Sequence, residues 1–536
     1  MDSQSDSVIY RYEPSQDDID RALNAIRESE EAVDSLNSQI SRLMVEVRVL
    51  EEQKRQLGIT ISRQRGLLTL ARRINGDILA RIFTFCVGDG WTRAPVVVSQ
   101  VCSSWREAAM MPAVWSSIYV DCDKGDPIAR CSLWLERSQQ SDLDITLRTS
   151  DQRDVINAVL NVLLEHSIRW RSLTLDTQFV RDANAILVQC RSAAPRLREI
   201  SVEVSNDERL PGAVEEEDLW NFRLVDCSTL FGGTTRLSTV SITSDLPSTW
   251  RGMANITTLN LQLHLCTLEP LRALFASDII ITLGEAPNLQ HLSITVPRRD
   301  VRPLRLGTDG LTPSVELLDL KSLSLSVPPV YMMLLQHITA PALESLTLRT
   351  PDDFHGFATE NVRGAMRSFM ASNSSNLRLL ELYDIDVAQE DFLAMFSNSP
   401  AMEELRLHGS EILDETVEAL CASHLPVLCP KLKRLDFRWC GHLSGTALVR
   451  LVESRAALPH EDDIASIIEL RVINCSFVKE KDVLAIAERC ICYLKMRDED
   501  DFCRRRGCCD NIRYRHRFEA RHARKLTKLQ AMRIKL

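Results

Sequence analysis

The sequence lacks long hydrophobic runs, and this absence argues against a membrane-spanning segment. Its longest apolar stretches, such as Ile279–Ile281 and Tyr331–Leu335, are far shorter than the roughly 20 residues that a transmembrane helix needs. The first ten residues, Met1–Tyr10, contain no basic segment followed by an apolar one, so we expect no secretory signal. A protein that neither spans a membrane nor enters the secretory pathway is therefore expected.

Familiar catalytic motifs are also missing. The sequence has no G-x-x-x-x-G-K-[ST] phosphate-binding loop, no G-x-S-x-G nucleophile motif and no H-E-x-x-H zinc motif. Each of these motifs marks a class of enzyme because its spacing places reactive groups together. We therefore expect no enzymatic activity, no catalytic residue and no cofactor.

The 16 cysteines, without a secretory signal, indicate a reducing compartment, the cytoplasm, the nucleus or both, where thiols stay free. One group of cysteines and histidines could ligate zinc, and it consists of Cys490, Cys492, Cys503, Cys508, Cys509, His516 and His522. It lacks the paired C-x2-C spacing that makes a tetrahedral zinc site recognisable. We therefore expect no metal site, and we expect Cys490 and Cys492 to pack inside the fold.

At 536 residues the chain is too long for one compact core, which predicts two or more domains. Its charge is unevenly distributed: residues 504–536 hold twelve Lys and Arg against two acidic residues, a balance of +10, which leaves −20 elsewhere in a chain of net charge −10. The charged C-terminal tail, 496–536, is a solvated or self-docking segment, a nuclear-targeting signal or a nucleic-acid contact. Only Tyr514 and Phe518 interleave with the basic residues, so nucleic-acid binding is the least favoured.

The N-terminal region changes character after a short polar stretch. Residues 1–18 are rich in Ser and Asp, and we expect them to be disordered. A heptad pattern follows over 19–66, with Ile19, Ile26, Val33, Ile40, Val47, Lys54 and Ile61 at a and Ala22, Ser29, Leu36, Leu43, Leu50 and Leu57 at d. β-Branched residues at a with leucine at d favour a parallel two-stranded coiled coil, so residues 19–61 predict a homodimer. The alternative is an amphipathic helix that lies on the protein's own body.

Residues 70–120 predict a small all-α module of three short helices. Asn75 can cap the first helix, and Gly88-Asp89-Gly90 ends it. A second helix follows Pro95, and Pro112 stops the chain again before a third. Because so few residues make a very small core, part of their apolar surface is expected to await a partner.

Two motifs in this module resemble the F-box. They are Ile74-Asn75-Gly76-Asp77-Ile78-Leu79-Ala80-Arg81-Ile82-Phe83 and Val98-Ser99-Gln100-Val101-Cys102-Ser103-Ser104-Trp105-Arg106. The later segments Pro112–Ile118 and Trp134–Ser138 are similar to the continuation in the expanded F-box families of mushroom-forming fungi. The family usually has Leu-Pro where this chain has Ile74-Asn75, and an asparagine can still cap the helix.

The resemblance implies that the module binds a Skp-type adaptor and, through it, a cullin ubiquitin ligase. The residues that the resemblance assigns to adaptor binding are Ile74, Asn75, Ile78, Leu79, Ile82, Phe83, Val101, Cys102 and Trp105. The chain would then be a substrate receptor that presents an unknown target protein for ubiquitination. The alternative, suggested by Asn75 and by the heptads, is a non-catalytic scaffold or structural protein whose F-box-like module binds no adaptor.

An apolar-x-x-apolar-x-apolar pattern recurs through residues 196–495. Its ten copies are Leu197/Ile200/Val202, Leu237/Val240/Ile242, Ile256/Leu259/Leu261, Leu289/Leu292/Ile294, Leu320/Leu323/Leu325, Leu343/Leu346/Leu348, Leu377/Leu380/Leu382, Met402/Leu405/Leu407, Leu432/Leu435/Phe437 and Ile467/Leu470/Val472. Five copies follow a proline two residues earlier: Pro195, Pro287, Pro341, Pro400 and Pro430. Proline there ends a helix and begins an extended segment.

This pattern predicts an α/β fold, a leucine-rich-repeat solenoid in which each unit is a short parallel strand and a return helix. It would follow the F-box module and the N-terminal helix. Generic parallel strands of an α/β domain are the alternative, which the number of copies disfavours. Residues 121–195 are assigned to a linker and the first irregular repeats, with an incomplete copy at Leu173 and Leu175.

Alternate residues of each strand would face solvent in such a solenoid. These positions are Glu203, Thr243, Gln262, Thr295, Ser326, Arg349, Tyr383, His408, Arg438 and Ile473. Arg349, Tyr383, His408 and Arg438 are the candidate contacts for a target protein, because aromatic and arginine side chains are enriched in interfaces. Plain solvation of these positions is the alternative. Cys440 and Cys475, each five residues after a strand leucine, are expected to be buried packing residues.

Overall fold

The computed structural model describes residues 15–68, 74–149, 153–190, 194–205, 236–243, 253–263, 276–296, 313–350, 360–385, 387–456, 464–475, 477–495 and 533–535. The chain forms two compact units: the first comprises residues 1–82 and 97–109, and the second residues 83–96 and 110–536. Most of the segment expected to be disordered, residues 1–14, lies outside the described residues, as do residues 496–532 of the charged tail.

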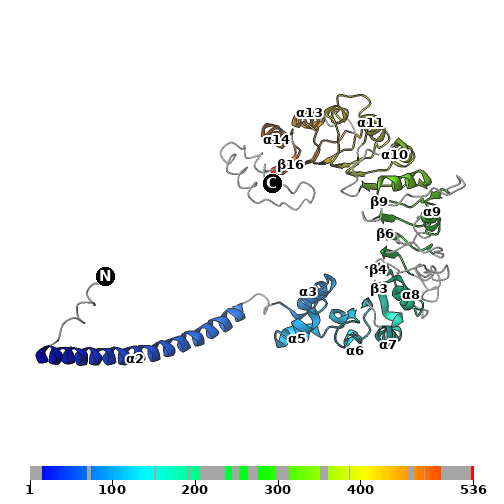
Figure 1. The fold of residues 1–536 in the computed structure, drawn as a ribbon. Helices are drawn as coiled ribbons and strands as arrows, with labels where there is room; N and C mark the ends of the chain where they lie inside the picture. The colour runs from blue at the N-terminus through cyan, green and yellow to red at the C-terminus, as the bar shows by residue number, and fades with distance from the viewer. Residues whose placement is uncertain are drawn as a thin grey trace. The chain divides into compact units, whose positions relative to one another are not determined.

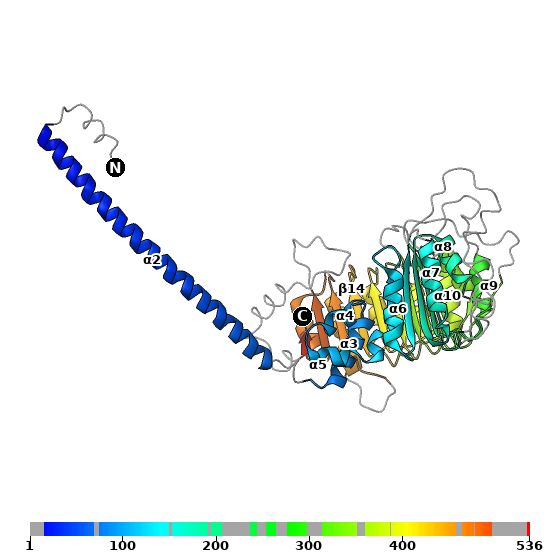
Figure 2. The same cartoon turned by 90° about the horizontal axis from the view of Figure 1, so that it is seen from below.

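A single long helix, α2 (Gln16–Leu68), dominates the first unit (Figures 1 and 2). It spans 53 residues and contains no proline to interrupt the backbone hydrogen bonds. It begins three residues before the heptad pattern, and all a and d side chains from Ile19 to Ile61 are exposed. Within the described part of the chain every helix, α2 included, is too short or too polar to cross a membrane.

Three short helices follow α2, but they are not the three that the sequence predicted, because the predicted second helix is divided in two and the predicted third is a short 3-10 helix that leads into a strand. They are α3 (Gly76–Gly88), α4 (Ala94–Ser99) and α5 (Ser103–Ala109). The carbonyl of Asn75 accepts a hydrogen bond from the Leu79 N–H at 3.0 Å, so α3 begins directly after the asparagine that was expected to cap it. A short 3-10 helix, η2 (Pro112–Trp115), has proline at its first position, where proline costs no hydrogen bond.

In the part of the chain that the structure describes, the second unit is built on one sheet of 15 parallel strands, which pair in chain order except that β8 and β10 form a separate pair. The strands of the sheet are β1 (Ser117–Asp121), β2 (Leu143–Thr149), β3 (Trp170–Thr177), β4 (Glu199–Val204), β5 (Thr239–Thr243), β6 (Thr258–Gln262), β7 (His291–Thr295), β9 (Ser322–Ser326), β11 (Ser345–Arg349), β12 (Leu379–Tyr383), β13 (Glu404–His408), β14 (Arg434–Arg438), β15 (Glu469–Ile473), β16 (Ile491–Lys495) and β17 (Ile534–Lys535), and the separate pair is β8 (Val315–Glu316) with β10 (Ile338–Thr339).

Where the structure describes the connections between strands, the return segments lie along one side of the sheet, the outer side in Figure 1. They are α6 (Pro127–Ser138), α7 (Arg153–Leu164), η3 (Ser167–Arg169), α8 (Val180–Leu187), α9 (Ala276–Gly284), η8 (Pro329–His337), α10 (Glu360–Asn373), α11 (Gln389–Ser397), α12 (Asp414–Glu418), α13 (Gly445–Ala456) and α14 (Glu480–Ala487). The opposite side, which we call the open face, carries none of these return segments (Figure 1). The architecture is α/β and solenoid-like.

The apolar pattern of the sequence explains this layering. All thirty apolar positions of the ten predicted copies are buried, and the copies correspond in order to strands β4–β7, β9 and β11–β15. Burying a leucine side chain contributes about 1.5–3 kcal/mol, so the burial of these positions contributes a large part of the free energy that holds the strands in the sheet. The five prolines lie in the turns before their strands, as their fixed φ predicts.

The sheet begins earlier and ends later than the sequence pattern. Strand β1 starts at Ser117, inside the range expected for the helical module, and β1 to β3 occupy much of the range assigned to a linker and irregular repeats. Their apolar residues are buried like those of the ten copies, but β1 and β3 have a tryptophan at the first apolar position, Trp115 and Trp170, and β2 has three alternating residues, Leu143, Ile145 and Leu147. At the other end, Ile534 and Lys535 return to pair with β16.

The strands β12 to β15 end in the same turn. The residues that follow them, Asp384, Gly409, Trp439 and Asn474, have φ angles of 52°, 62°, 52° and 55°. A β-carbon on Gly409 would collide with the carboxylate of Asp384, which explains the glycine there. Tryptophan rarely adopts this left-handed conformation, so Trp439 is the unusual member of the series.

A buried arginine fixes the segment between α12 and β14. Arg455 of α13 is 2% exposed, and its guanidinium donates to the carbonyls of Leu420 at 2.8 Å, Leu428 at 2.8 Å and Cys429 at 3.1 Å. Burial lowers the pKa of Arg455. These three hydrogen bonds tie α13 to the irregular segment and pair carbonyls that no regular strand or helix would satisfy.

The cysteines near the end of the sheet are packing residues. Cys440 and Cys475 are buried, as expected, and their thiols donate to the carbonyls of Leu407 at 3.5 Å and Phe437 at 3.6 Å. Burial raises the pKa of Cys490 and of Cys492 to about 12, which keeps these thiols protonated. The other members of the predicted zinc-like group, Cys503, Cys508, Cys509, His516 and His522, lie outside the described residues.

Candidate protein-binding surfaces

The helix α3 presents exposed apolar side chains beside buried ones. Ile78 and Ile82 are 56% and 40% exposed, whereas Leu79 and Phe83 are 2% exposed. The sequence predicted all four as adaptor contacts. Because Leu79 and Phe83 lie four residues apart on the buried stripe of an amphipathic helix, their side chains support the fold and do not offer contact surface. Ile78 and Ile82 remain available.

The other predicted adaptor contacts also differ in their exposure to solvent. Val101 is 57% exposed and Asn75 is exposed, whereas Ile74, Cys102 and Trp105 are half-buried. The sequence reasoning missed Val97, which is 40% exposed. It also missed Phe85, which is exposed and lies seven residues after Ile78 on the same helix. The i, i+4, i+7 spacing of Ile78, Ile82 and Phe85 is the signal that identifies this face.

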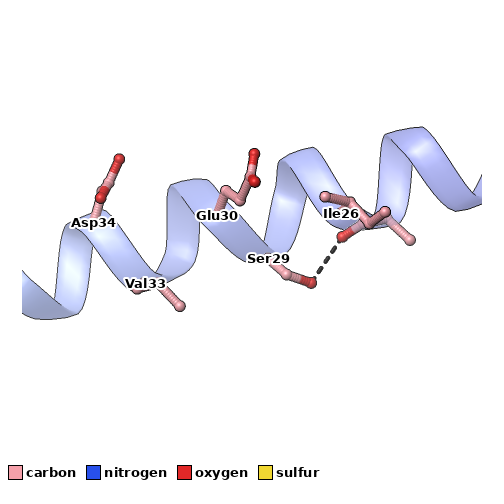
Figure 3. A pocket seen from close by; sticks show the side chains of 6 residues that line it. Ile26, Ser29, Glu30, Val33 and Asp34 are labelled. Carbon is pink, nitrogen blue, oxygen red and sulfur yellow. Dashed lines mark hydrogen bonds between the residues drawn. The ribbon is translucent and has the colours of Figure 1, made fainter.

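The heptad seam of α2 is a second apolar surface. Figure 3 shows one stretch of it, where Ser29 and Val33 point to the side opposite from Glu30 and Asp34. The hydroxyl of Ser29, a d position, donates to the carbonyl of Ala25 at 2.7 Å. Because the helix backbone satisfies this hydroxyl, the serine weakens the apolar seam without leaving a polar group that needs a partner.

The open face of the sheet is organised in rows by the register of its strands. The last outward residue of each strand pairs with the last outward residue of the next, from Glu203 on β4 to Ile473 on β15. All ten positions that the sequence assigned to the solvent-facing row therefore lie side by side. The four candidate target contacts, Arg349, Tyr383, His408 and Arg438, occupy consecutive strands, β11 to β14.

The chemistry of the open face changes along the sheet. The outward residues of β5 to β9 are almost all small or neutral: Thr239, Ser241, Thr243, Thr258, Asn260, Gln262, His291, Ser293, Thr295, Ser322, Ser324 and Ser326. On β11 to β15 they include five arginines and four carboxylates: Arg349, Arg406, Arg434, Arg438, Arg471, Glu381, Glu404, Asp436 and Glu469. We call this second part the charged half of the open face.

Charges alternate between neighbouring strands in the charged half. The middle row runs Glu381, Arg406, Asp436 and Arg471 across β12 to β15. Arg406 bonds Glu404 on its own strand at 2.6 Å and lies 3.4 Å from Glu381 on the next strand. Such cross-strand pairs each contribute about 0.2–1 kcal/mol. The sequence reasoning missed this row because it selected only the last outward residue of each strand.

The four candidate target contacts form a continuous cluster. The guanidinium of Arg349 lies over the Tyr383 ring, 4.4 Å from its centroid. The Tyr383 and His408 rings meet edge to face with centroids 5.0 Å apart. On the far side, both Nε and Nη2 of Arg438 donate to the Asp436 carboxylate, at 2.8 and 2.7 Å. Stacking and bidentate pairing hold these side chains in fixed orientations.

His408 is the most unusual residue of this cluster. It is 5% exposed, and among the described residues neither of its ring nitrogens has a hydrogen-bond partner. The Glu381 carboxylate is 4.0 Å from Nε2, which is too long for a hydrogen bond. Burial, followed by repulsion from Arg438, lowers the pKa of His408 to about 4, so its imidazole is neutral at pH 7.

Two more buried polar groups without partners belong to the turns that follow β13 and β14. They are the hydroxyl of Ser410 and the indole N–H of Trp439, and neither has a hydrogen-bond partner among the described residues. Register brings them close, because the Gly409 N–H donates to the Arg438 carbonyl at 2.7 Å. Buried polar groups of native proteins are nearly always paired, so three such groups at the ends of two adjacent strands need an explanation.

Metal binding has no support in the described residues, because nowhere in them do three His, Cys, Asp or Glu side chains gather in a geometry that could hold an ion.

No protein-family model and no curated protein matches the chain. Several solved structures are similar, including these two. One, a protein from Bacteroides fragilis, is 14% identical over 62% of this chain and 78% of its own, with a TM-score of 0.30. The other, the complex of Rad7 and Elc1 from yeast, is 13% identical over 80% of this chain and 95% of its own, with a TM-score of 0.33. At these scores neither adds to what the sheet itself shows.

Proposed function

We propose that this chain is a non-catalytic substrate receptor that recruits a target protein to a Skp–cullin–F-box ubiquitin ligase. The observation that carries the proposal is the apolar surface of the short helices, on which Ile78, Ile82 and Val101 are exposed within the two motifs that resemble the F-box. Exposed isoleucine and valine side chains gathered in one small module are typical of a surface that a partner covers. The adaptor would take this surface, and the ligase would supply the chemistry.

The solenoid would hold the target. Its sheet fits the leucine-rich-repeat prediction, because one parallel strand and one return segment recur with the predicted apolar positions buried. A solenoid of this type offers an extended face for protein recognition. Binding both partners on one chain raises the effective concentration of target lysines near the ligase. A cytoplasmic or nuclear location, where such ligases work, is part of the same proposal.

The exposed seam of α2 would pair with a second copy of the chain. Its a positions hold isoleucine and valine and its d positions hold leucine from Leu36 onward, a distribution that favours parallel dimers. All of these side chains are exposed in one chain. Dimerisation would place two adaptor surfaces and two target surfaces in one complex and would increase avidity.

Co-purification with a Skp-type adaptor tests the proposal. The wild-type chain should retain the adaptor, and the Ile78→Asp/Ile82→Asp variant should lose it, because a buried carboxylate in an apolar contact is costly. Both side chains are exposed, so this variant should fold. Ile168→Asp is the matched control, since Ile168 is 60% exposed on η3 and lies outside the F-box-like motifs.

The possible outcomes separate the two functions. Loss of the adaptor in the double variant alone supports the receptor. Failure of the wild-type chain to retain the adaptor removes the ligase role and favours the scaffold, a non-catalytic protein with an F-box-like fold. The residue that favours the scaffold is Asn75, which is exposed at the place where the family usually has proline.

A further inference from the structure

The charged half of the open face has its arginines outermost and its carboxylates underneath. The side chain of Asp436 is 5% exposed and that of its partner Arg438 is 31% exposed. Glu404 is 16% exposed beneath Arg406, which is 36% exposed. A ligand that approaches this surface therefore meets guanidinium groups first, although the acidic and basic residues are nearly equal in number.

The carboxylates underneath hold the guanidiniums in place. Arg434 bonds Glu404 at 2.8 Å, and Arg471 bonds Glu469 at 2.7 Å. An arginine has five N–H donors in a fixed fork, and a carboxylate engages at most two of them in a bidentate pair. Donors remain for a ligand, and they lose little conformational freedom when it binds, since the ion pairs have already oriented them.

The buried donors beside these arginines point to the same conclusion. His408 and Trp439 each keep an N–H group buried without a partner among the described residues. Trp439 also keeps a left-handed backbone, with φ of 52°. Unsatisfied groups and backbone strain both cost free energy, and they persist where a ligand supplies the missing acceptor. Both residues lie at the ends of β13 and β14, within the charged half.

We infer that the charged half of the open face binds an acidic segment of a partner protein, an inference that rests on the proposed role of the solenoid as the target-binding part. Carboxylates of the segment pair with Arg406 and Arg438, and an acceptor of the segment reaches the buried N–H groups. A nucleic acid fits less well. Single-stranded nucleic acid is bound largely by stacking of its bases on aromatic rings, and the Tyr383 ring of the charged half already packs against Arg349 and His408.

Fluorescence anisotropy with the full-length chain tests the inference. The probe is a fluorescein-labelled peptide of four Asp-Gly-Ser repeats, and its neutral counterpart has asparagine in place of aspartate. The acidic peptide should bind, and raising the salt concentration should weaken it because the contacts are partly exposed ion pairs. The neutral peptide should bind at least about tenfold more weakly.

Two matched double variants locate the site. Arg438→Gln/Asp436→Asn removes an ion pair of the charged half without leaving a lone charge, and it should weaken the acidic peptide about tenfold. Arg171→Gln/Asp144→Asn removes an ion pair on β2 and β3, at the other end of the sheet, and should leave binding unchanged. Trp439→Phe removes one buried donor and should weaken binding about fivefold.

Three results would overturn the inference. They are equal binding of the acidic and neutral peptides, equal weakening by the two double variants, and tighter binding of a single-stranded oligothymidylate than of the acidic peptide. The proposed function fails separately, through the adaptor assay above. If the chain retains the adaptor but does not bind the acidic peptide, only this inference is refuted. If it binds the peptide but not the adaptor, only the proposed ligase role is refuted.

Discussion

Replacing His408 with leucine should make the charged half of the sheet less sensitive to acid. The wild-type imidazole is buried with neutral nitrogens, and its pKa falls from 6.5 to about 4 in the folded chain. Between these two values the unfolded chain binds the proton more strongly than the folded chain, so folding stability decreases as the pH falls through this window. Above pH 6.5 both states are neutral at this residue and the effect vanishes.

The size of the effect follows from the shift. The difference between the folded and unfolded pKa values of His408 lowers the folding stability by about 3 kcal/mol once the pH lies below both values. About 2 kcal/mol of that stability is lost between pH 7 and pH 5. Arg438 and two further arginines, Arg406 and Arg349, oppose the protonated ring, and Asp436 favours it. The leucine variant has no proton to bind, and its apolar side chain also removes two unsatisfied nitrogens, so it should be at least as stable as the wild type at pH 7.

Native-state hydrogen exchange at β13 (Glu404–His408) measures this difference. Because wild type and variant are compared at the same pH, the intrinsic pH dependence of exchange cancels. The stability of His408→Leu relative to wild type should rise by about 2 kcal/mol from pH 7 to pH 5. His291→Leu, on the distant strand β7, controls for the change of side chain. A relative stability that stays constant across this range would refute the argument, since it would mean that the imidazole is not buried in the neutral form.

Two further predictions concern stability and assembly. Arg455→Met should lower the free energy of unfolding by roughly 3 kcal/mol, because it removes three hydrogen bonds of a buried guanidinium and leaves the Leu420 carbonyl without this donor. Urea titration measures the change, and Arg450→Met, an exposed arginine on the same helix, should cost under about 1 kcal/mol. Leu36→Asp/Leu43→Asp should convert a dimer to a monomer in sedimentation equilibrium, because two aspartates at d positions disrupt an apolar seam. A monomeric wild type would instead favour a helix that packs on its own chain.

The strands could be predicted from sequence because their signal is local. Leu435 and Phe437, for example, lie two residues apart beneath the helix layer, and the same spacing recurs in every predicted copy. The early strands were harder to find because β1 has a tryptophan, Trp115, in place of the leucine three residues before its alternating pair, and β2 has the polar Asp142 three residues before Ile145. Strand β17 could not be found at all, since a two-residue strand such as Ile534–Lys535 is defined only by its pairing with β16.

The sequence could predict which residues of the candidate site point outward, but it could not predict how deeply each of them is buried. Alternation along each strand identified Arg349, Tyr383, His408 and Arg438 as outward residues, and register brought them together. The burial of His408 depends on neighbours from other strands that no local pattern reveals. Likewise, the division of the module into exposed Ile78 and buried Leu79 depends on which side of α3 faces the rest of the fold.

The unbroken register of the strands gives the open face a fixed spacing. Adjacent strands lie about 4.8 Å apart, and an extended peptide advances about 3.3 Å per residue. Arg406 and Arg471 occupy the same row two strands apart, on β13 and β15, so a peptide that crosses the strands meets them about three residues apart. Affinity should therefore depend on the spacing of the acidic residues in a partner segment. A segment with the same net charge but a different spacing should bind more weakly.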